Sequence, residues 1–224
     1  QNGHEDDFGF TNQVSAAYAT LSWQKSAFDM EFGMRTESFN IAIANQEQQT
    51  KELNLLPNVR LGYRWNEKHA VRFFLRSSMI YPMFHQLNNF EAFADPFTML
   101  TGNMGLQPYR FNSSNVEHIW SNGNLMLITA AFIEQRTNII NTLHSIHETG
   151  IVEVSFENLG DLYQYGMQSS GALNLGKRLS LNHSVRLFNT NSRGHDAGSF
   201  PVRNKLAIET GLSGVMAFEN DFFL

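Results

Sequence analysis

Long stretches of alternating side chains are the feature that most constrains this sequence. Between residues 27 and 37, one set of alternate positions is apolar and the other is mostly charged. The apolar set is Phe28, Met30, Phe32 and Met34, and the intervening set includes Asp29, Glu31 and Arg35. A helix of period 3.6 would mix the two classes, whereas a strand places successive side chains on opposite faces. The pattern predicts strands with one apolar and one polar face.

The same alternation recurs in residues 55–66, 71–79 and 203–218. The apolar members of these stretches are Pro57, Val59, Leu61, Tyr63, Trp65, Val71, Phe73, Leu75, Met79, Leu206, Ile208, Leu212, Met216 and Phe218. Phe74 and Ile80 interrupt the polar face of the second stretch. We therefore expect an all-β chain.

A water-soluble β-sandwich also alternates, so periodicity alone leaves that alternative open. Sandwich strands are usually about five or six residues long, whereas these stretches reach about eleven, the length that a tilted strand needs to cross a bilayer. Trp23, Trp65 and Trp120 each lie close to a short turn, as expected for aromatic residues at a membrane interface. These features favour an antiparallel transmembrane β-barrel.

The connections between the predicted strands alternate in length. Short turns are expected at residues 24–26, 66–68, 122–124 and 176–178, the third of which contains an Asn-Gly hairpin signal. Long polar segments are expected at residues 38–54, 82–112, 136–149 and 190–202. Outer-membrane barrels have short turns in the periplasm and long loops outside the cell.

Residues 151–175 are predicted to form one strand with a β-bulge. The apolar face moves from even positions, such as Phe156, to odd positions, such as Tyr165. An extra residue between Asn158 and Leu162, with Gly160 as the residue best suited to it, would keep Phe156 and Tyr165 on the same outer face.

This interpretation gives nine strands, with a turn at residues 219–221 and a tenth strand beginning near Phe222. A single-chain bacterial barrel has an even number of strands and no open edge. We therefore expect residues 1–224 to be part of one larger barrel domain, with the plug and the remaining strands outside them. Residues 1–7 contain no basic segment followed by an apolar one, so no export signal is expected there.

Composition excludes several other classes. No apolar run approaches the ~20 residues of a membrane-spanning helix, and the mean hydropathy of −0.30 fits apolar residues interleaved with polar ones. The net charge of −5 provides no basic surface for nucleic acid. The chain has no Cys, so disulfide frameworks and thiolate metal sites are ruled out.

A series of short motifs in residues 81–108 resembles one family. The sequence reads Tyr-Pro-Met-Phe from Tyr81, then Asp95-Pro96-Phe97, then Thr-Gly-Asn-Met-Gly-Leu-Gln-Pro over residues 101–108. This resembles the barrel of TonB-dependent outer-membrane receptors, in the branch with a carboxypeptidase-regulatory-like front domain. Weaker similarities lie at residues 55–58 and at residues 158–166.

The resemblance is specific over about thirty residues, and it has departures. Tyr81 replaces an Arg, Met104 replaces a Pro, Tyr109 replaces an acidic residue, and Met167 or Gln168 lies where the family has Glu. The loss of these charged positions affects the contacts expected inside the barrel rather than the fold.

The resemblance implies a location in the outer membrane of a Gram-negative bacterium, in contact with lipid, and active uptake of a nutrient powered by TonB through a plug. It leaves the substrate open among a siderophore, a glycan, a peptide and a vitamin; a glycan transporter would have a surface lipoprotein as its lid. A non-transporting surface barrel, an adhesin or an assembly scaffold, is the alternative.

The long segment from residue 82 to residue 112 is the candidate substrate-contact region. The main interpretation of its turn-forming residues is structural: they fold the loop back on itself. Long barrel loops also carry function, and aromatic side chains can cover a ligand. The candidate contact residues are Phe84, His85, Gln86, Phe90, Phe97, Tyr109 and Arg110.

Metal and catalytic sites are not expected. His144, His147 and Glu148 have a spacing that could hold a metal or haem, but no third ligand or supporting partner can be named. Residues 4–7, His-Glu-Asp-Asp, are expected to be a hydrated segment. No Gly-x-Ser-x-Gly motif is present, and no spacing groups Ser, His and Asp. The sequence therefore predicts a protein that is not an enzyme and has no cofactor.

Overall fold

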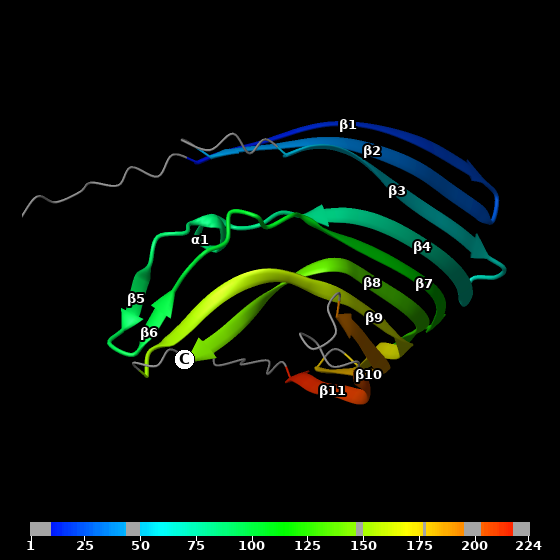
Figure 1. The fold of residues 1–224 in the computed structure, drawn as a ribbon. Coiled ribbons are helices and arrows are strands. Elements are labelled where there is room, and N and C mark those ends of the chain that lie inside the picture. The colour runs from blue at the N-terminus through cyan, green and yellow to red at the C-terminus, as the bar shows by residue number, and fades with distance from the viewer. Residues whose placement is uncertain (1–9, 44–49, 147–149, 177, 195–202, 217–224) are drawn as a thin grey trace, which may run out of the picture.

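Nine long antiparallel strands form one curved sheet (Figure 1). The structure, a computed structural model, describes residues 10–43, 50–146, 150–176, 178–194 and 203–216. The strands are β1 Phe10–Lys25, β2 Phe28–Ile43, β3 Thr50–Arg64, β4 His69–Ile80, β7 Tyr109–Asn122, β8 Leu125–Ile146, β9 Val152–Leu175, β10 Leu179–Gly194 and β11 Arg203–Met216. Each pairs with the next in this order, and β1 and β11 do not pair within the described residues. The nine-strand prediction is confirmed.

The two faces of the sheet differ as the alternation predicts. Phe32 of β2 lies opposite Val59 of β3, which in turn lies opposite Leu75 of β4. The ring of Phe32 is 46% exposed on this convex face, so it does not enter an internal core. On the other face, Arg60 lies opposite Glu31 and donates to its carboxylate over 3.3 Å. An apolar convex face and a polar concave face fit a barrel wall between lipid and an aqueous lumen.

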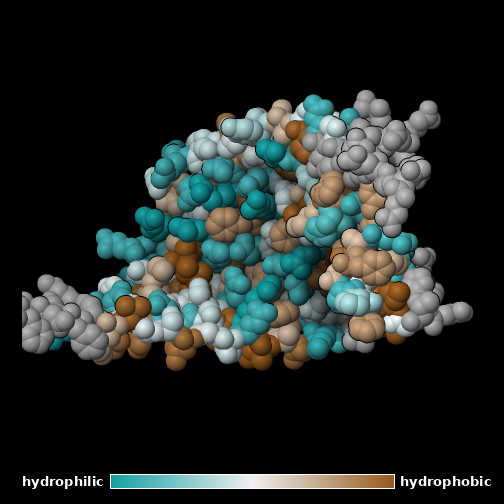
Figure 2. All heavy atoms as spheres, turned by 90° about the vertical axis from the view of Figure 1, so that its left-hand side faces the viewer, coloured by the Kyte–Doolittle hydropathy of each residue, from teal (hydrophilic) through white to brown (hydrophobic). Residues whose placement is uncertain are grey.

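Figure 2 shows the molecule from the end that carries the long connections. Hydrophilic side chains gather around the hollow in the middle of this view. Hydrophobic side chains lie along the lower edge of the same view. The distribution agrees with the strand registers, in which apolar residues alternate outward.

The four tight turns lie together at the opposite end of the sheet. They occupy residues 26–27, 65–68 and 123–124, and the fourth lies at Gly176 and Arg178, between which residue 177 is outside the described part of the chain. The predicted short turns are therefore confirmed at the described positions, the first of them shifted by about one residue. At the second turn, the backbone N–H groups of Lys68 and His69 both donate to Oδ1 of Asn66 over 2.9 Å. Gly123 and Gly176 have positive φ angles of 58° and 69°, which glycine adopts without steric cost.

Aromatic rings line the convex face next to these turns, as predicted for an interfacial girdle. The ring of Trp65 is parallel within 5° to the rings of His69 and His118, at 5.6 Å from each. The two imidazoles face each other, with 3.0 Å between Nδ1 of His69 and Nε2 of His118. Trp120 stacks on His69 at 6.5 Å, and Trp23 is 48% exposed on β1.

The predicted long loops contain more strand than expected. The segment predicted as a loop from residue 136 is strand as far as Ile146, which lies opposite Val152 of β9. The predicted loop ends near residues 38 and 190 also continue β2 and β10. Beyond the bilayer a strand has water on both faces, so its backbone ladder continues without the alternation that marks a membrane-spanning segment. The prediction of loops there was wrong for this reason.

The predicted irregularity in β9 is confirmed, and β8 contains a second one. Leu162 lies opposite Arg136, Gly160 opposite Ile139, and Asn158 opposite Ile140. Each strand therefore has one extra residue, in β8 before Ile139 and in β9 before Gly160. Gly160 has a φ of +155°, and a Cβ there would lie 2.1 Å from a carbonyl oxygen of β10.

The predicted direction of Phe156 was wrong. Its ring is 7% exposed and packs against Phe39 of β2, which shares the concave face with Glu37, two residues before it. Tyr165 is 50% exposed on the convex face. An apolar ring is tolerated on the concave side because part of the chain covers it there, as described below.

Several sequence predictions lie outside the described residues. They are the hydrated segment at residues 4–7, His147 and Glu148, the turn at residues 219–221 and the start of a tenth strand near residue 222. Within the described residues, no helix has the length and apolar character needed to cross a bilayer.

Candidate functional site

Residues 81–108 connect β4 to β7 and form a folded segment at the end of the sheet (Figure 1). This cross-connection contains the short helix α1, Phe84–Leu87, and a hairpin of β5, Ala92–Asp95, and β6, Thr98–Leu100. β6 pairs in parallel with the first residues of β9, from Val152 to Val154. Among the described residues, β10 pairs with β9 only as far as Gly160, and β6 pairs with the part of β9 that precedes it.

A small apolar core holds the cross-connection to the sheet. Leu87 is fully buried and Leu106 is 5% exposed, and both pack against Phe39 of β2 and Phe156 of β9. Ile140 of β8 packs against the same cluster. The cross-connection therefore bridges strands that are far apart in the sheet.

Asparagine side chains add specific polar anchors on β9. Asn103 donates from Nδ2 to the backbone oxygen of Phe156 over 3.0 Å. Asn158 accepts from the backbone N–H of Gln107 and donates to its carbonyl oxygen, over 2.9 and 3.0 Å. It also donates to the carbonyl oxygen of Asn138 over 2.8 Å. The side chain at the bulge thus links β8, β9 and the cross-connection.

Tyr81 anchors the start of the segment on β2. Its hydroxyl donates to Oε2 of Glu37 over 2.5 Å, and its ring stacks on Phe39 with 4.6 Å between centroids. Arg35 donates to the other oxygen of the same carboxylate. Burial, together with the hydrogen bond to Glu37, raises the pKa of Tyr81 above its ordinary value. Tyr81 therefore remains a hydrogen-bond donor across the physiological range.

The outer surface of the cross-connection is aromatic. Exposed fractions are 52% for Phe84, 38% for Phe90, 61% for Phe93 and 71% for Phe97. The carboxylate of Asp95 accepts from the backbone N–H of Phe97 over 2.8 Å, and this bond lowers the pKa of Asp95. Phe93 was not predicted as a contact residue, although it lies between Phe90 and Phe97, which were.

The other candidate residues in α1 have different surroundings. His85 is exposed, and its ring meets the edge of Phe156 at 5.7 Å. Gln86 is bound within the segment: its Oε1 accepts from the backbone N–H of Met83 over 2.9 Å, and its carbonyl oxygen accepts from that of Asn103 over 2.7 Å.

Arg110 lies in the wall, where β3 and β4 separate. The pairing of these strands ends at Asn58 opposite Arg76. Beyond this point, the Arg110 guanidinium reaches from β7 to Asn54 and to the carbonyl oxygen of Leu55, over 3.0 and 3.1 Å. Arg110 thus satisfies an unpaired edge of β3.

Two further candidates lie apart from the aromatic surface. Tyr109, with Arg136 and Asp161, lines a separate cavity of about 390 Å³ beside the bulge. His144 lies in β8, opposite Val154, and is exposed. Within the described residues, no group of three His, Cys, Asp or Glu side chains is arranged to hold a metal ion.

The sequence matches a family of known architecture. Residues 1–219 fit the model of the outer membrane protein beta-barrel family. The chain belongs to this family. It therefore lies in the outer membrane of a Gram-negative bacterium, in agreement with the convex apolar face. No curated protein matches the sequence.

Solved structures of transporters and receptors share the fold. The FrpB iron transporter from Neisseria meningitidis is 10% identical with a TM-score of 0.66, over 97% of this chain and 32% of that one. The copper transporter OprC is 14% identical with a TM-score of 0.63, over 92% and 33%. The siderophore receptor PirA from Pseudomonas aeruginosa is 11% identical with a TM-score of 0.54, over 92% and 49%.

The chain thus spans about a third of the first two proteins and half of the third. At these identities the likeness shows the fold, which agrees with the expected receptor barrel. The matching proteins are transporters and receptors rather than enzymes, in line with the expectation from the sequence.

Proposed function

We propose that this chain forms part of the wall of a TonB-dependent receptor that takes up a scarce nutrient across the outer membrane. The observation that carries the proposal is the cross-connection, which is anchored on β2 and β9 and presents aromatic rings at the end with the long connections. A barrel that served only as an adhesin or scaffold would not need a segment folded over its concave face. A selective importer needs a fixed surface that holds its ligand above the lumen.

The proposed contact residues are Phe84, His85, Phe90, Phe93 and Phe97. All five side chains are exposed on the cross-connection. Gln86 and Arg110 are omitted because their polar atoms already bond to the protein. Tyr109 is not among the five, because it lines the separate cavity beside the bulge. Only a ligand large enough to reach that cavity would contact it.

The proposed partners follow from the transport cycle. A plug domain would close the lumen and contact TonB, which delivers the energy for uptake. A surface lipoprotein would cover the aromatic residues if the ligand is a glycan.

Uptake in cells that carry the full-length protein tests the proposal. Growth is measured on limiting siderophore-bound iron, oligosaccharide, peptide or vitamin, with and without a functional TonB. We expect one of these nutrients to support growth only when both proteins are present. If growth on every nutrient is independent of both proteins, the transport proposal is wrong and an adhesin or scaffold is favoured.

A paired variant tests the contact surface. Replacing Phe93 and Phe97 together with Ala should raise the nutrient concentration for half-maximal growth by about tenfold, the effect of losing about 1.4 kcal/mol of binding. Phe28→Ala is the matched control, because Phe28 is likewise an exposed Phe, at 50%, but lies on the convex face. An equal effect of both changes would show that the cross-connection does not hold the ligand.

A further inference from the structure

The concave face of the β3–β4 hairpin carries a column of basic side chains. Arg60 and Arg64 occupy even positions of β3, and Arg72 and Arg76 occupy even positions of β4. Arg72 lies opposite Gly62, and Arg76 opposite Asn58, so all four share the face of Glu31. Lys68 extends the column into the turn. This arrangement contrasts with the net charge of −5 of the whole chain.

Among the described residues, Arg60 is the one arginine of this column that forms ion pairs. Arg60 lies 3.3 Å from a carboxylate oxygen of Glu31 and 3.9 Å from one of Asp29. In the part of the chain that the structure describes, no ion pair involves Arg64, Lys68, Arg72 or Arg76. Glu117 lies across from Arg72 on β7; its carboxylate accepts a hydrogen bond from Asn115 and keeps its negative charge, but it forms no ion pair with Arg72.

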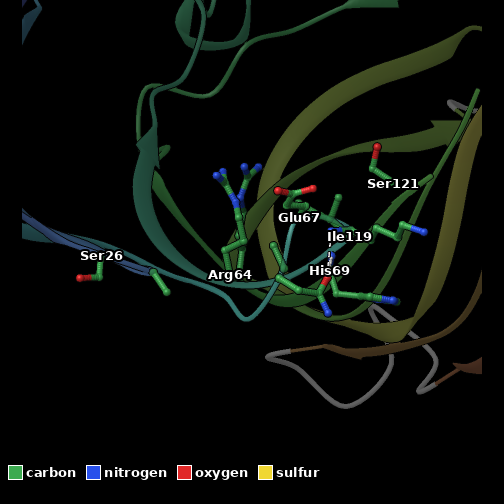
Figure 3. A pocket seen from close by; sticks show the side chains of 11 residues that line it. Ser26, Arg64, Glu67, His69, Ile119 and Ser121 are labelled. Atoms are coloured by element: carbon green, nitrogen blue, oxygen red, sulfur yellow. Dashed lines mark hydrogen bonds between the residues drawn. The ribbon is translucent and has the colours of Figure 1, made fainter. Parts of the chain in front are cut away.

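Three of the unneutralised residues surround a cavity of about 590 Å³ at the turn end of the sheet. Arg64, Lys68 and Arg72 line it, together with one carboxylate, that of Glu67. Figure 3 shows the side chains of Arg64 and Glu67 extending from the hairpin toward the same open space. Ser121 of β7 closes another part of the wall.

The backbone around this cavity is held firmly. The N–H of Arg64 donates to the carbonyl oxygen of Ala27 over 2.9 Å, and that of Ser121 donates to the carbonyl oxygen of Lys68 over 2.8 Å. The side chain of Asn66 fixes the turn between β3 and β4. The basic side chains therefore project from a preorganised frame, which reduces the ordering that a bound ligand would require.

Neighbouring positive charges on a concave wall destabilise one another unless an anion lies between them. Guanidinium groups match carboxylate and phosphate groups, because their donors form a planar fork. We propose that this cavity is a binding site for a small multivalent anion of the phosphate or carboxylate class, held by Arg64 and Arg72 with Lys68 at its edge. The site concerns binding alone and does not depend on the uptake proposed above.

Calorimetric titration with pyrophosphate tests the site in the full-length protein, purified from outer membranes in a neutral detergent. The wild-type protein should bind pyrophosphate saturably, with an affinity that falls as salt is raised. Replacing Arg64 and Arg72 together with Gln should weaken binding by at least about tenfold. Arg60→Gln is the matched control, because Arg60 lies in the same column but is already paired, and it should change the affinity by less than about twofold.

Three results would overturn the inference. They are the absence of saturable binding to the wild-type protein, an unchanged affinity in the double variant, and an equal loss in the Arg60→Gln control. An acidic segment of the protein that already fills the cavity would give the first of these. Heat-modifiable migration on gels verifies that each variant retains a folded barrel. Loss of pyrophosphate binding with nutrient uptake intact, or the reverse, separates this site from the proposed transport function.

Discussion

Leu87→Ala should release the cross-connection without unfolding the sheet. Leu87 is fully buried in the small core that joins α1 to β2 and β9. Truncating a buried Leu to Ala costs about 2–5 kcal/mol. Because the side chain becomes solvated when the segment detaches, that cost applies to the docked state alone. At about 3 kcal/mol, the equilibrium for opening increases by about 100-fold.

Hydrogen exchange read by mass spectrometry measures this opening. The N–H of Gly102 donates to the carbonyl oxygen of Asn88, and the N–H of Asn103 to that of Gln86, so both amides are protected only while the segment is folded. Peptides that cover these amides should exchange about 100-fold faster in Leu87→Ala, since exchange follows the open population. Peptides from the middle of β2 and β3 should be unchanged.

Met83→Ala is the control for this experiment. Met83 belongs to the same segment but is 62% exposed, so its truncation should change exchange by less than about threefold. Unchanged protection of Gly102 and Asn103 in Leu87→Ala would refute the argument that this core holds the segment. Equal acceleration in the control would refute it as well.

Three further predictions concern the wall and its anchors. Phe32→Arg should destabilise the barrel by about 2–4 kcal/mol in lipid if Phe32 lies near the bilayer midplane, and Asn58→Arg on the concave face should not, as measured by urea unfolding in vesicles. Gly160→Ala should lower the free energy of unfolding by about 1–3 kcal/mol, because the new Cβ would lie 2.1 Å from a carbonyl oxygen of β10. Gly33→Ala is the control, because a Cβ there makes only ordinary contacts. Equal unfolding midpoints for the two variants would contradict this. Tyr81 has a raised pKa, so its stabilising effect is complete below pH 10.0 and is lost as the pH rises toward the folded-state pKa. Protease resistance of the cross-connection should fall over that range in the wild type but stay level in Tyr81→Phe.

Side-chain alternation predicted the wall well, because lipid on one side and water on the other impose a rule on every residue of a spanning segment. The rule fails where the environment changes. From residue 136 to Ile146 the chain is strand, but water on both faces leaves no alternating signal. The sequence there resembled a loop for that reason.

The candidate site was predicted less completely, since it depends on contacts between distant residues. Turn-forming residues located the cross-connection, but nothing local indicated that Leu87 and Phe156 would meet. The parity slip in residues 151–175 located the bulge correctly. The predicted direction of Phe156 was wrong because the cross-connection covers this part of the concave face and excludes water from it.

The bridging of β2 and β9 by one segment has a consequence for assembly. The core around Leu87 requires side chains from both strands, which are separated in the sheet by β3, β4, β7 and β8. The segment cannot reach its final position until these six strands have paired in order. Residues 81–108 should therefore become resistant to protease later than the strand hairpins on either side of them, and their resistance reports when this part of the wall is complete.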